Sequence, residues 1–232
     1  MGIAENVAEI RERMALAARR AGRSADKVIL MGVSKTFPAE SIHEAYEAGI
    51  RTFGENRVQE FSDKSASLET LKDAEWRLIG HLQSNKASKA AELFHAVDSV
   101  DSLRLAERLN TAAGALGKTL RVLIEINIGG EGAKAGLHAD SPELERLLQA
   151  APGLHHLELQ GLMAIPPFAE NPEEARPYFR KVRELRDAIS KRKPPGVGME
   201  VLSMGMSHDF EVAIEEGSTC VRVGTAIFGS RT

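Results

Sequence analysis

The sequence predicts an α/β fold, a single (β/α)8 TIM barrel over residues 1–232 with one extra helix at its N-terminus. Eight short apolar runs alternate with segments of helical pattern, which is typical of a parallel sheet with a helix after each strand. The chain of 232 residues is close in length to the roughly 250 residues of such barrels. An open doubly wound sheet is the competing fold, but its usual Gly-x-Gly-x-x-Gly pattern does not follow the first strand.

The first predicted element is a helix, because apolar residues recur every three or four positions from Ile3 to Ala17, and Gly22 follows as a stop signal. The next element, 28–34, is an uninterrupted apolar run rich in β-branched residues, as expected of a strand buried on both faces. The eight predicted strands are 28–34, 51–54, 75–80, 96–100, 120–127, 157–163, 200–204 and 219–223.

The helices between these strands carry start signals. Pro38 begins a helical pattern directly after the first strand. Ser141 and Asn171 each precede a proline at the first helical position, so we expect both to be helix caps. Asp101 and Ser207 are expected to cap the helices that follow them. The glycine-rich stretch 129–136 is predicted to be a mobile loop.

The composition is that of an ordinary soluble protein. Hydrophobic residues make up 43% and charged residues 27%, and the net charge of −3 favours neither a nucleic-acid nor a membrane partner. The single cysteine, Cys220, lies in an apolar run and is predicted to be a buried thiol, which suits a reducing cytoplasm. The chain shows no signal peptide, no apolar stretch of about 20 residues and no Cys/His spacing typical of a structural metal site.

Unusual polar residues follow the predicted strands, and in a barrel all such loops meet at one mouth. Lys35 comes at the end of the first strand, where apolar walls would favour the neutral amine that attacks an aldehyde. A solvent-exposed loop lysine is the alternative. The further polar clusters are 54–57, 80–86, 203–207 and 224–225.

The last two clusters are typical of an anion site. Gly205 would let the backbone approach a ligand closely, and Ser207 would lie at a helix N-terminus, where a phosphate is favoured. Gly224 and Thr225 add a small residue and a hydroxyl after the eighth strand. Two tight turns with a capping serine are the alternative. A reactive lysine beside a phosphate site indicates a phosphorylated aldehyde, and pyridoxal 5′-phosphate (PLP) is the obvious candidate.

The run Ser207-His208-Asp209 contains the letters of a hydrolase triad. Neighbouring helical residues point about 100° apart, so these three side chains are not expected to form one.

Five motifs then resemble the YggS/PROSC family of pyridoxal phosphate homeostasis proteins. They are 32–36, 53–60, 79–86, 161–164, and 202–207 together with 222–224. The resemblance implies a monomeric barrel like the N-terminal domain of bacterial alanine racemase. It also implies a Schiff base between PLP and Lys35.

The resemblance further implies roles for individual residues. Asn56 would lie near the cofactor ring and Arg222 would face the pyridine nitrogen. Lys134 matches a family lysine connected with cofactor exchange, and an exposed loop lysine is the alternative. The residues expected around the phosphate or elsewhere in the cofactor site are His81, Ser203, Met204, Gly205, Ser207, Gly224 and Thr225.

We expect a carrier rather than an enzyme. Racemisation needs two opposed bases, and alanine racemases take the second from a tyrosine of a separate domain. The chain ends at Thr232, soon after the eighth strand, and Tyr46 and Tyr178 lie in helical patterns. Arg222 would also keep the pyridine nitrogen unprotonated, which weakens the ring as an electron sink; racemases tolerate this, but aminotransferase chemistry does not. An ion pair at the barrel end is the alternative for Arg222.

The expected function is therefore to supply or limit free PLP in the cytoplasm, with apo forms of PLP-dependent enzymes as candidate partners. A racemase of low activity is the first alternative. A class I aldolase, which also uses a barrel lysine, is the second.

Overall fold

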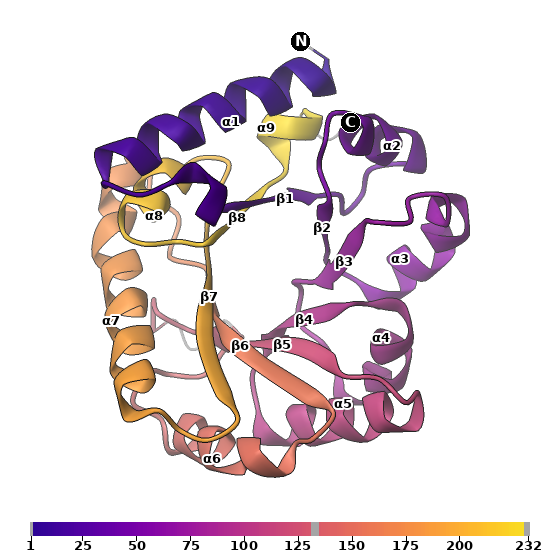
Figure 1. The fold of residues 1–232 in the computed structure, drawn as a ribbon, viewed down its shortest axis with the longest axis vertical. Helices are drawn as coiled ribbons and strands as arrows, with labels where there is room; N and C mark the ends of the chain where they lie inside the picture. Colours follow the sequence, from indigo (N-terminus) through magenta and orange to yellow (C-terminus); the bar gives the residue numbers. More distant parts are fainter. Residues whose placement is uncertain (1, 131–134, 230–232) are drawn as a thin grey trace.

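The computed structural model describes residues 2–130 and 135–229, and these form a closed parallel barrel (Figure 1). The strands follow one another in chain order around the barrel, and β8 closes it by pairing in parallel with β1. They are β1 (Ile29–Val33), β2 (Thr52–Glu55), β3 (Glu75–Leu78), β4 (Ala96–Val100), β5 (Leu120–Ile126), β6 (Leu157–Ala164), β7 (Val197–Met206) and β8 (Cys220–Val223). All eight predicted strands are thus confirmed, although β7 is longer than expected at both ends.

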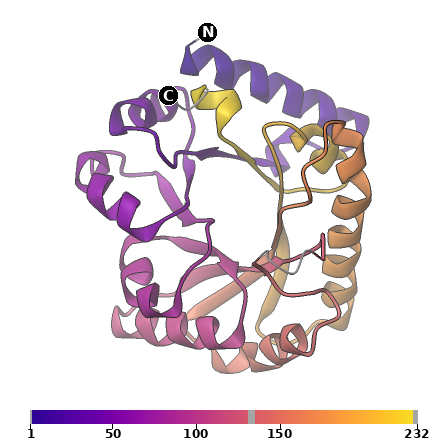
Figure 2. The ribbon, with the colours of Figure 1, turned by 180° about the vertical axis from the view of Figure 1, so that it is seen from behind.

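The helices form a ring outside the strands, which Figure 2 shows from behind. They are α1 (Ile3–Arg20), α2 (Ala39–Glu47), α3 (Val58–Ser65), α4 (Ala87–Leu93), α5 (Leu103–Ala115), α6 (Pro142–Ala150), α7 (Arg176–Arg192), α8 (Phe210–Glu215) and α9 (Thr225–Phe228). Short 3-10 helices are η1 (Ala25–Lys27), η2 (Ala66–Leu68), η3 (Ser84–Lys86), η4 (Ala151–Gly153) and η5 (Pro172–Ala175).

The extra N-terminal helix is also confirmed. Val7, Ile10 and Met14 lie on one face of α1 and are almost fully buried. The helix packs against α2, α8 and α9, so the two ends of the barrel sequence meet beneath it (Figure 1). Because α8 and α9 are short, they cover only part of the barrel's outer surface, and α1 covers the rest of that side.

Two of the predicted caps are confirmed. The Ser141 hydroxyl accepts the Leu144 N–H at the start of α6. The Asn171 side chain accepts the Glu173 N–H at the start of η5, which leads into α7.

The other two cap assignments are wrong. Ser102, one residue after Asp101, accepts the Leu105 N–H and caps α5. Asp209 rather than Ser207 precedes α8. The Ser207 hydroxyl instead accepts the N–H groups of Gly224 at 3.2 Å and Ala226 at 3.4 Å, where α9 begins. The barrel brings these two segments together, and local spacing alone did not indicate that.

The barrel interior holds a buried ion pair that the sequence did not reveal. Arg77 on β3 donates to Asp98 on β4 through three hydrogen bonds of 2.7 to 3.1 Å, and both side chains are at most 5% exposed. Burial lowers the pKa of Arg77, but the carboxylates of Asp98 and Glu75 more than reverse this and raise it. Cys220 is buried as predicted, and burial raises the pKa of its thiol to about 11.

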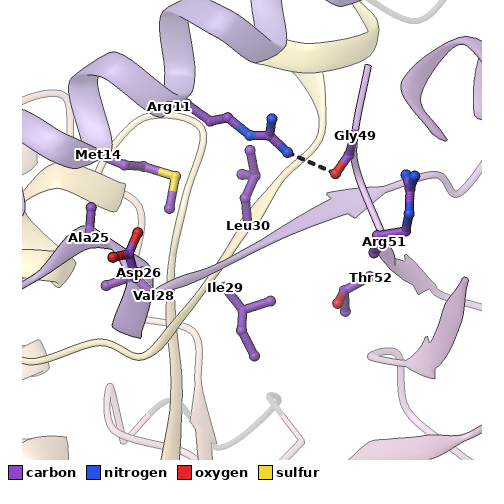
Figure 3. Close-up of a pocket in the computed structure, with 10 residues that line it drawn as sticks. All are labelled: Arg11, Met14, Ala25, Asp26, Val28, Ile29, Leu30, Gly49, Arg51 and Thr52. Atoms are coloured by element: carbon purple, nitrogen blue, oxygen red, sulfur yellow. Dashed lines mark hydrogen bonds between the residues drawn. The ribbon is translucent and has the colours of Figure 1, made fainter. Parts of the chain in front are cut away.

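The amino-terminal end of the barrel has a cavity of about 370 Å³ between α1 and the starts of β1 and β2 (Figure 3). Arg11 lies at its edge and donates to the Gly49 carbonyl at 2.7 Å. Arg51, the second arginine that lines this cavity, is paired with Asp73 at 2.8 Å. The described residues that line this cavity include no lysine, histidine or cysteine.

None of the described helices has the length and apolar character needed to cross a membrane. Within the same described ranges, no cluster of three or more His, Cys, Asp or Glu side chains is placed to hold a metal ion.

Candidate functional site

A second cavity, of about 280 Å³, lies at the carboxyl ends of the strands. Six of the predicted site residues line it, and they come from the loops or ends of β1, β2, β7 and β8. These six are Lys35, Asn56, Ser207, Arg222, Gly224 and Thr225. The remaining described lining residues are Val33, Ile79, Ile165, Phe168, Met206 and His208. The mouth expected from the loop pattern therefore exists as one continuous space.

Lys35 sits in a tight turn directly after β1 and is partly buried. The Phe37 N–H donates to the Ser34 carbonyl at 3.2 Å, which places Lys35 and Thr36 at the two central positions. Thr36 has a φ of 67°, in the left-handed region that β-branched residues rarely adopt. Such a conformation costs about 1–3 kcal/mol and persists only where neighbouring contacts hold it.

A buried polar network lies behind this turn. The Ser34 hydroxyl donates to Glu55 Oε1 at 2.6 Å, and the Lys64 ammonium lies 2.8 Å from the same oxygen. Glu55 is fully buried, and burial raises its pKa even though Lys64 opposes the shift. Its second oxygen, Oε2, has no hydrogen-bond partner among the described residues.

Asn56 is fixed against the backbone of the neighbouring β3 loop. A Cβ added at Gly80 would lie 2.2 Å from the Asn56 carbonyl oxygen and 2.6 Å from its Oδ1. Only glycine permits this close approach. The motif 79–86 thus contributes to the site through a missing side chain as well as through Ile79, which lines the cavity.

Arg222 forms the floor of the cavity and is 3% exposed. It donates to the Ser203 carbonyl at 2.7 Å, the Ser203 hydroxyl at 2.8 Å and the Ala164 carbonyl at 2.9 Å. These bonds hold the guanidinium between β6, β7 and β8. Burial lowers the pKa of Arg222, but guanidinium groups stay protonated in proteins, so the floor carries a positive charge.

Ser207, Gly224 and Thr225 lie together at the β7 and β8 side of the cavity. Gly205 is not among the described residues that line the cavity, and its role at the phosphate stays a prediction. Its φ is 93°, and an added Cβ would lie 2.5 Å from the Ala213 Cβ of α8. The small size of Gly205 thus permits the close packing of α8.

Three other predicted site residues also do not line the cavity. Met204 is fully buried in the core, and the Ser203 hydroxyl accepts a hydrogen bond from Arg222 at 2.8 Å. His81 is largely exposed and contacts Asp101 Oδ2 at 3.1 Å. Lys134 lies outside the described residues, so its role stays a prediction.

The segment after β6 contributes two lining residues that sequence reasoning missed. Ile165 and Phe168 are apolar residues in a loop, 37% and 81% exposed, and their exposure becomes visible only in the structure. The ring of Phe168 lies 5.8 Å from that of His208. Ile165 and Phe168 form an apolar rim at the cavity.

Glu125 is another missed residue. It is 8% exposed on β5, and its Oε2 has no partner among the described residues. It lines a neighbouring cavity of about 240 Å³ that also has Ile165 in its wall. Burial, reinforced by Asp101, raises its pKa to about 7 although Arg222 and His81 oppose the shift.

The apparent triad is confirmed as a false lead. Ser207 contacts the start of α9, His208 Nε2 lies 2.9 Å from the Glu170 carbonyl oxygen, and Asp209 accepts the Met206 N–H. The three side chains have separate partners.

The donor set of the cavity fits a phosphorylated aromatic aldehyde. Lys35 contributes an amine that can react with an aldehyde, the apolar side chains suit a ring, and the fixed positive charge suits a ring nitrogen or another electron-rich atom. Hydroxyls and a glycine backbone are available for a phosphate. The volume of about 280 Å³ is near the lower limit, about 300 Å³, of ordinary ligand pockets.

Comparison with known proteins adds to this geometry. The family model for the alanine racemase N-terminal domain matches residues 5–232. A relative from Aquifex aeolicus, named pyridoxal phosphate homeostasis protein, is 45% identical over 231 residues and covers 100% of this chain and 99% of its own. A relative of the same name from Escherichia coli is 46% identical over 231 residues and covers 99% and 97%.

Solved structures of other proteins are also similar to this chain. PipY of Synechococcus elongatus, with PLP bound, is 40% identical and has a TM-score of 0.84, with 98% of this chain and 100% of PipY covered. An alanine racemase from Streptomyces coelicolor shares the fold at 22% identity and a TM-score of 0.71. In that case 100% of this chain matches 59% of the racemase.

Proposed function

This chain belongs to the family of pyridoxal phosphate homeostasis proteins, and from that premise we propose that it binds PLP at its barrel mouth and takes part in PLP homeostasis. The observation that carries the proposal is the single cavity that joins Lys35 to Ser207, Gly224 and Thr225 across the floor made by Arg222. An aldehyde group and a phosphate group on one small molecule would match its two ends.

Lys35 would hold the cofactor through a Schiff base. Nζ of Lys35 would supply the amine for that bond, with one water released, and addition of water or of another amine would reverse it. Ser207, Gly224 and Thr225 would bind the phosphate through hydroxyl and N–H groups. Asn56 would orient the ring from the β2 side.

Arg222 disfavours the chemistry of aminotransferases, which pair the ring nitrogen with a carboxylate, but racemases tolerate it. Bound PLP supplies an electron sink to amino-acid chemistry, and that sink works best when its ring nitrogen is protonated. The fixed positive charge of Arg222 disfavours a second positive charge beside it. A racemase would also need a base opposite Lys35, and the described lining residues include no tyrosine. Tyr46 and Tyr178 lie on α2 and α7, outside the strands.

The physiological setting is part of the same proposal. The protein would act in the cytoplasm as a monomer and would deliver PLP to apo forms of PLP-dependent enzymes, or limit the free aldehyde. The rim formed by Ile165 and Phe168 leaves the ligand site reachable from solvent, which suits exchange.

The visible spectrum tests the covalent assignment. The purified protein loaded with PLP should be yellow, and borohydride should bleach it and leave the added mass on the peptide that contains Lys35. Lys35→Ala should lose the visible band, whereas the exposed mouth lysine variant Lys86→Ala should keep it. Unchanged spectrum and affinity in Lys35→Ala would show that another residue holds the cofactor.

Deuterium exchange separates the carrier from a racemase. Alanine and serine incubated in D₂O with the loaded protein should keep their α-protons over many hours. Rapid exchange with turnover would show that the protein is a racemase rather than a carrier.

A further inference from the structure

Lys64 on α3 does not line the cavity, yet it contacts both sides of the turn that carries Lys35. Its ammonium donates to the Ser34 carbonyl at 3.0 Å and to the Phe37 carbonyl at 3.4 Å. The side chain is only 14% exposed, so little water competes for these contacts. The residue before Lys35 and the residue two positions after it are therefore tied to one cation.

Two carboxylates complete the same arrangement. Glu55 lies 2.8 Å from the Lys64 ammonium and accepts the Ser34 hydroxyl at 2.6 Å. Glu60 lies 3.5 Å from that ammonium and accepts the Thr36 N–H. Glu55, Glu60 and Lys64 thus contact the turn at the residues on either side of Lys35. We refer to these three residues as the turn clamp.

The turn needs such contacts because of Thr36. Thr36 and Lys193 are the two non-glycine residues with positive φ in the part of the chain that the structure describes. Lys193 ends helix α7, where a left-handed residue is common. Thr36 lies in a loop, and a β-branched residue there would relax to another φ if the Glu60 acceptor were lost.

We propose that the turn clamp is a set of positioning residues that aims Lys35 into the cavity and so sets how fast the lysine bonds and releases the cofactor. The inference rests on the proposed function. Bond formation requires Nζ to approach the aldehyde carbon within a narrow range of distance and direction. A turn that samples other backbone conformations presents the amine correctly for a smaller fraction of the time.

Lys64→Met tests this directly, because it keeps the unbranched apolar stem of the side chain and removes the charge and all three donors. The visible band should form about tenfold more slowly or worse after PLP is added. The matched control is Lys89→Met, which removes an exposed lysine paired with Glu92 at 2.8 Å on α4. This control should form the band at the wild-type rate.

A second readout separates positioning from general damage. In a Lys35→Ala background PLP binds without a covalent bond, and adding Lys64→Met should leave that affinity within about twofold, since the clamp acts through the lysine. A merely structural role would weaken noncovalent binding as well. Glu60→Gln should behave nearly as wild type because its amide oxygen still accepts the Thr36 N–H, whereas Glu60→Ala should slow the band.

Glu60 is 30% exposed, so Glu60→Ala keeps the test usable if Lys64→Met folds poorly. A wild-type rate in both Lys64→Met and Glu60→Ala, with a normal band in the wild-type protein, would refute the clamp and leave the carrier function standing. Weakened noncovalent binding in the Lys35→Ala background would refute the clamp too. A wild-type protein that never forms the band would instead refute the carrier function itself.

Discussion

Replacing Asp98 by leucine should destabilise the protein strongly, because it leaves the Arg77 guanidinium buried without its main partner. The two side chains share three hydrogen bonds and are 0% and 5% exposed. Opposite charges about 4 Å apart attract by about 4 kcal/mol at an effective dielectric constant of about 20. Removing one partner of a buried ion pair typically destabilises a protein by about 3–5 kcal/mol. This range includes the attraction of about 4 kcal/mol.

Urea unfolding followed by circular dichroism measures this cost. With a slope of about 3 kcal/mol per molar urea, a loss of about 4 kcal/mol lowers the midpoint by about 1.3 M. Arg77→Met alone should cost a similar amount because it leaves Asp98 unpaired. The double variant Arg77→Met, Asp98→Leu should be more stable than the sum of the two losses by about 2 kcal/mol or more.

Additive losses in the double variant would show that the two side chains do not act as a pair. A loss below about 1 kcal/mol for Asp98→Leu would show that the remaining partner, Glu75 at 2.6 Å from Arg77, satisfies the guanidinium alone. Either result would refute the reasoning from burial.

Three further outcomes follow from residues in or near the site. Gly80→Ala should displace Asn56, since the new Cβ would lie 2.2 Å from its carbonyl oxygen; we expect about 1–3 kcal/mol of lost stability in thermal unfolding and weaker PLP binding in a spectral titration. Gly205→Ala should lower stability by at least as much because its Cβ would lie 2.5 Å from the Ala213 Cβ at a positive φ, and a wild-type melting temperature would contradict this. Burial raises the pKa of Glu125 to about 7 from an unfolded value of 4.5, so its protonated form stabilises the fold, and that contribution is lost as pH rises through 7. Between pH 5 and pH 8 the protein without cofactor should lose about 2–3 kcal/mol from this group, and Glu125→Gln should flatten that part of the pH profile.

The fold was predictable because the strands are short apolar runs with little internal ambiguity. The run that became β1 has no helical periodicity, and each of the eight runs is followed by a helical pattern. Element ends were harder. Ser102 rather than Asp101 caps α5, and the choice between two adjacent capping residues depends on backbone angles that local sequence does not determine.

The candidate site was predictable where residues lie at strand ends, and less so where packing decides. Lys35, Asn56 and Arg222 line the mouth because closing the barrel brings the carboxyl ends of β1, β2 and β8 together. The buried carboxyls of Glu55 and Glu125 were not predicted as such, since acidic residues are rarely buried and their partners are remote in sequence. The close packing of α8 against Gly205 was not predicted, because a glycine that admits a helix and one that admits a ligand look the same in a sequence.

Arg222 is held by hydrogen bonds to Ser203 and Ala164 of the same chain, so the floor of the cavity does not need a ligand to keep its shape. Association with such a preorganised receptor requires little rearrangement. Repeated binding and release of PLP would then leave the barrel unchanged. The rate of exchange would depend on the formation and breakage of the single covalent bond to Lys35.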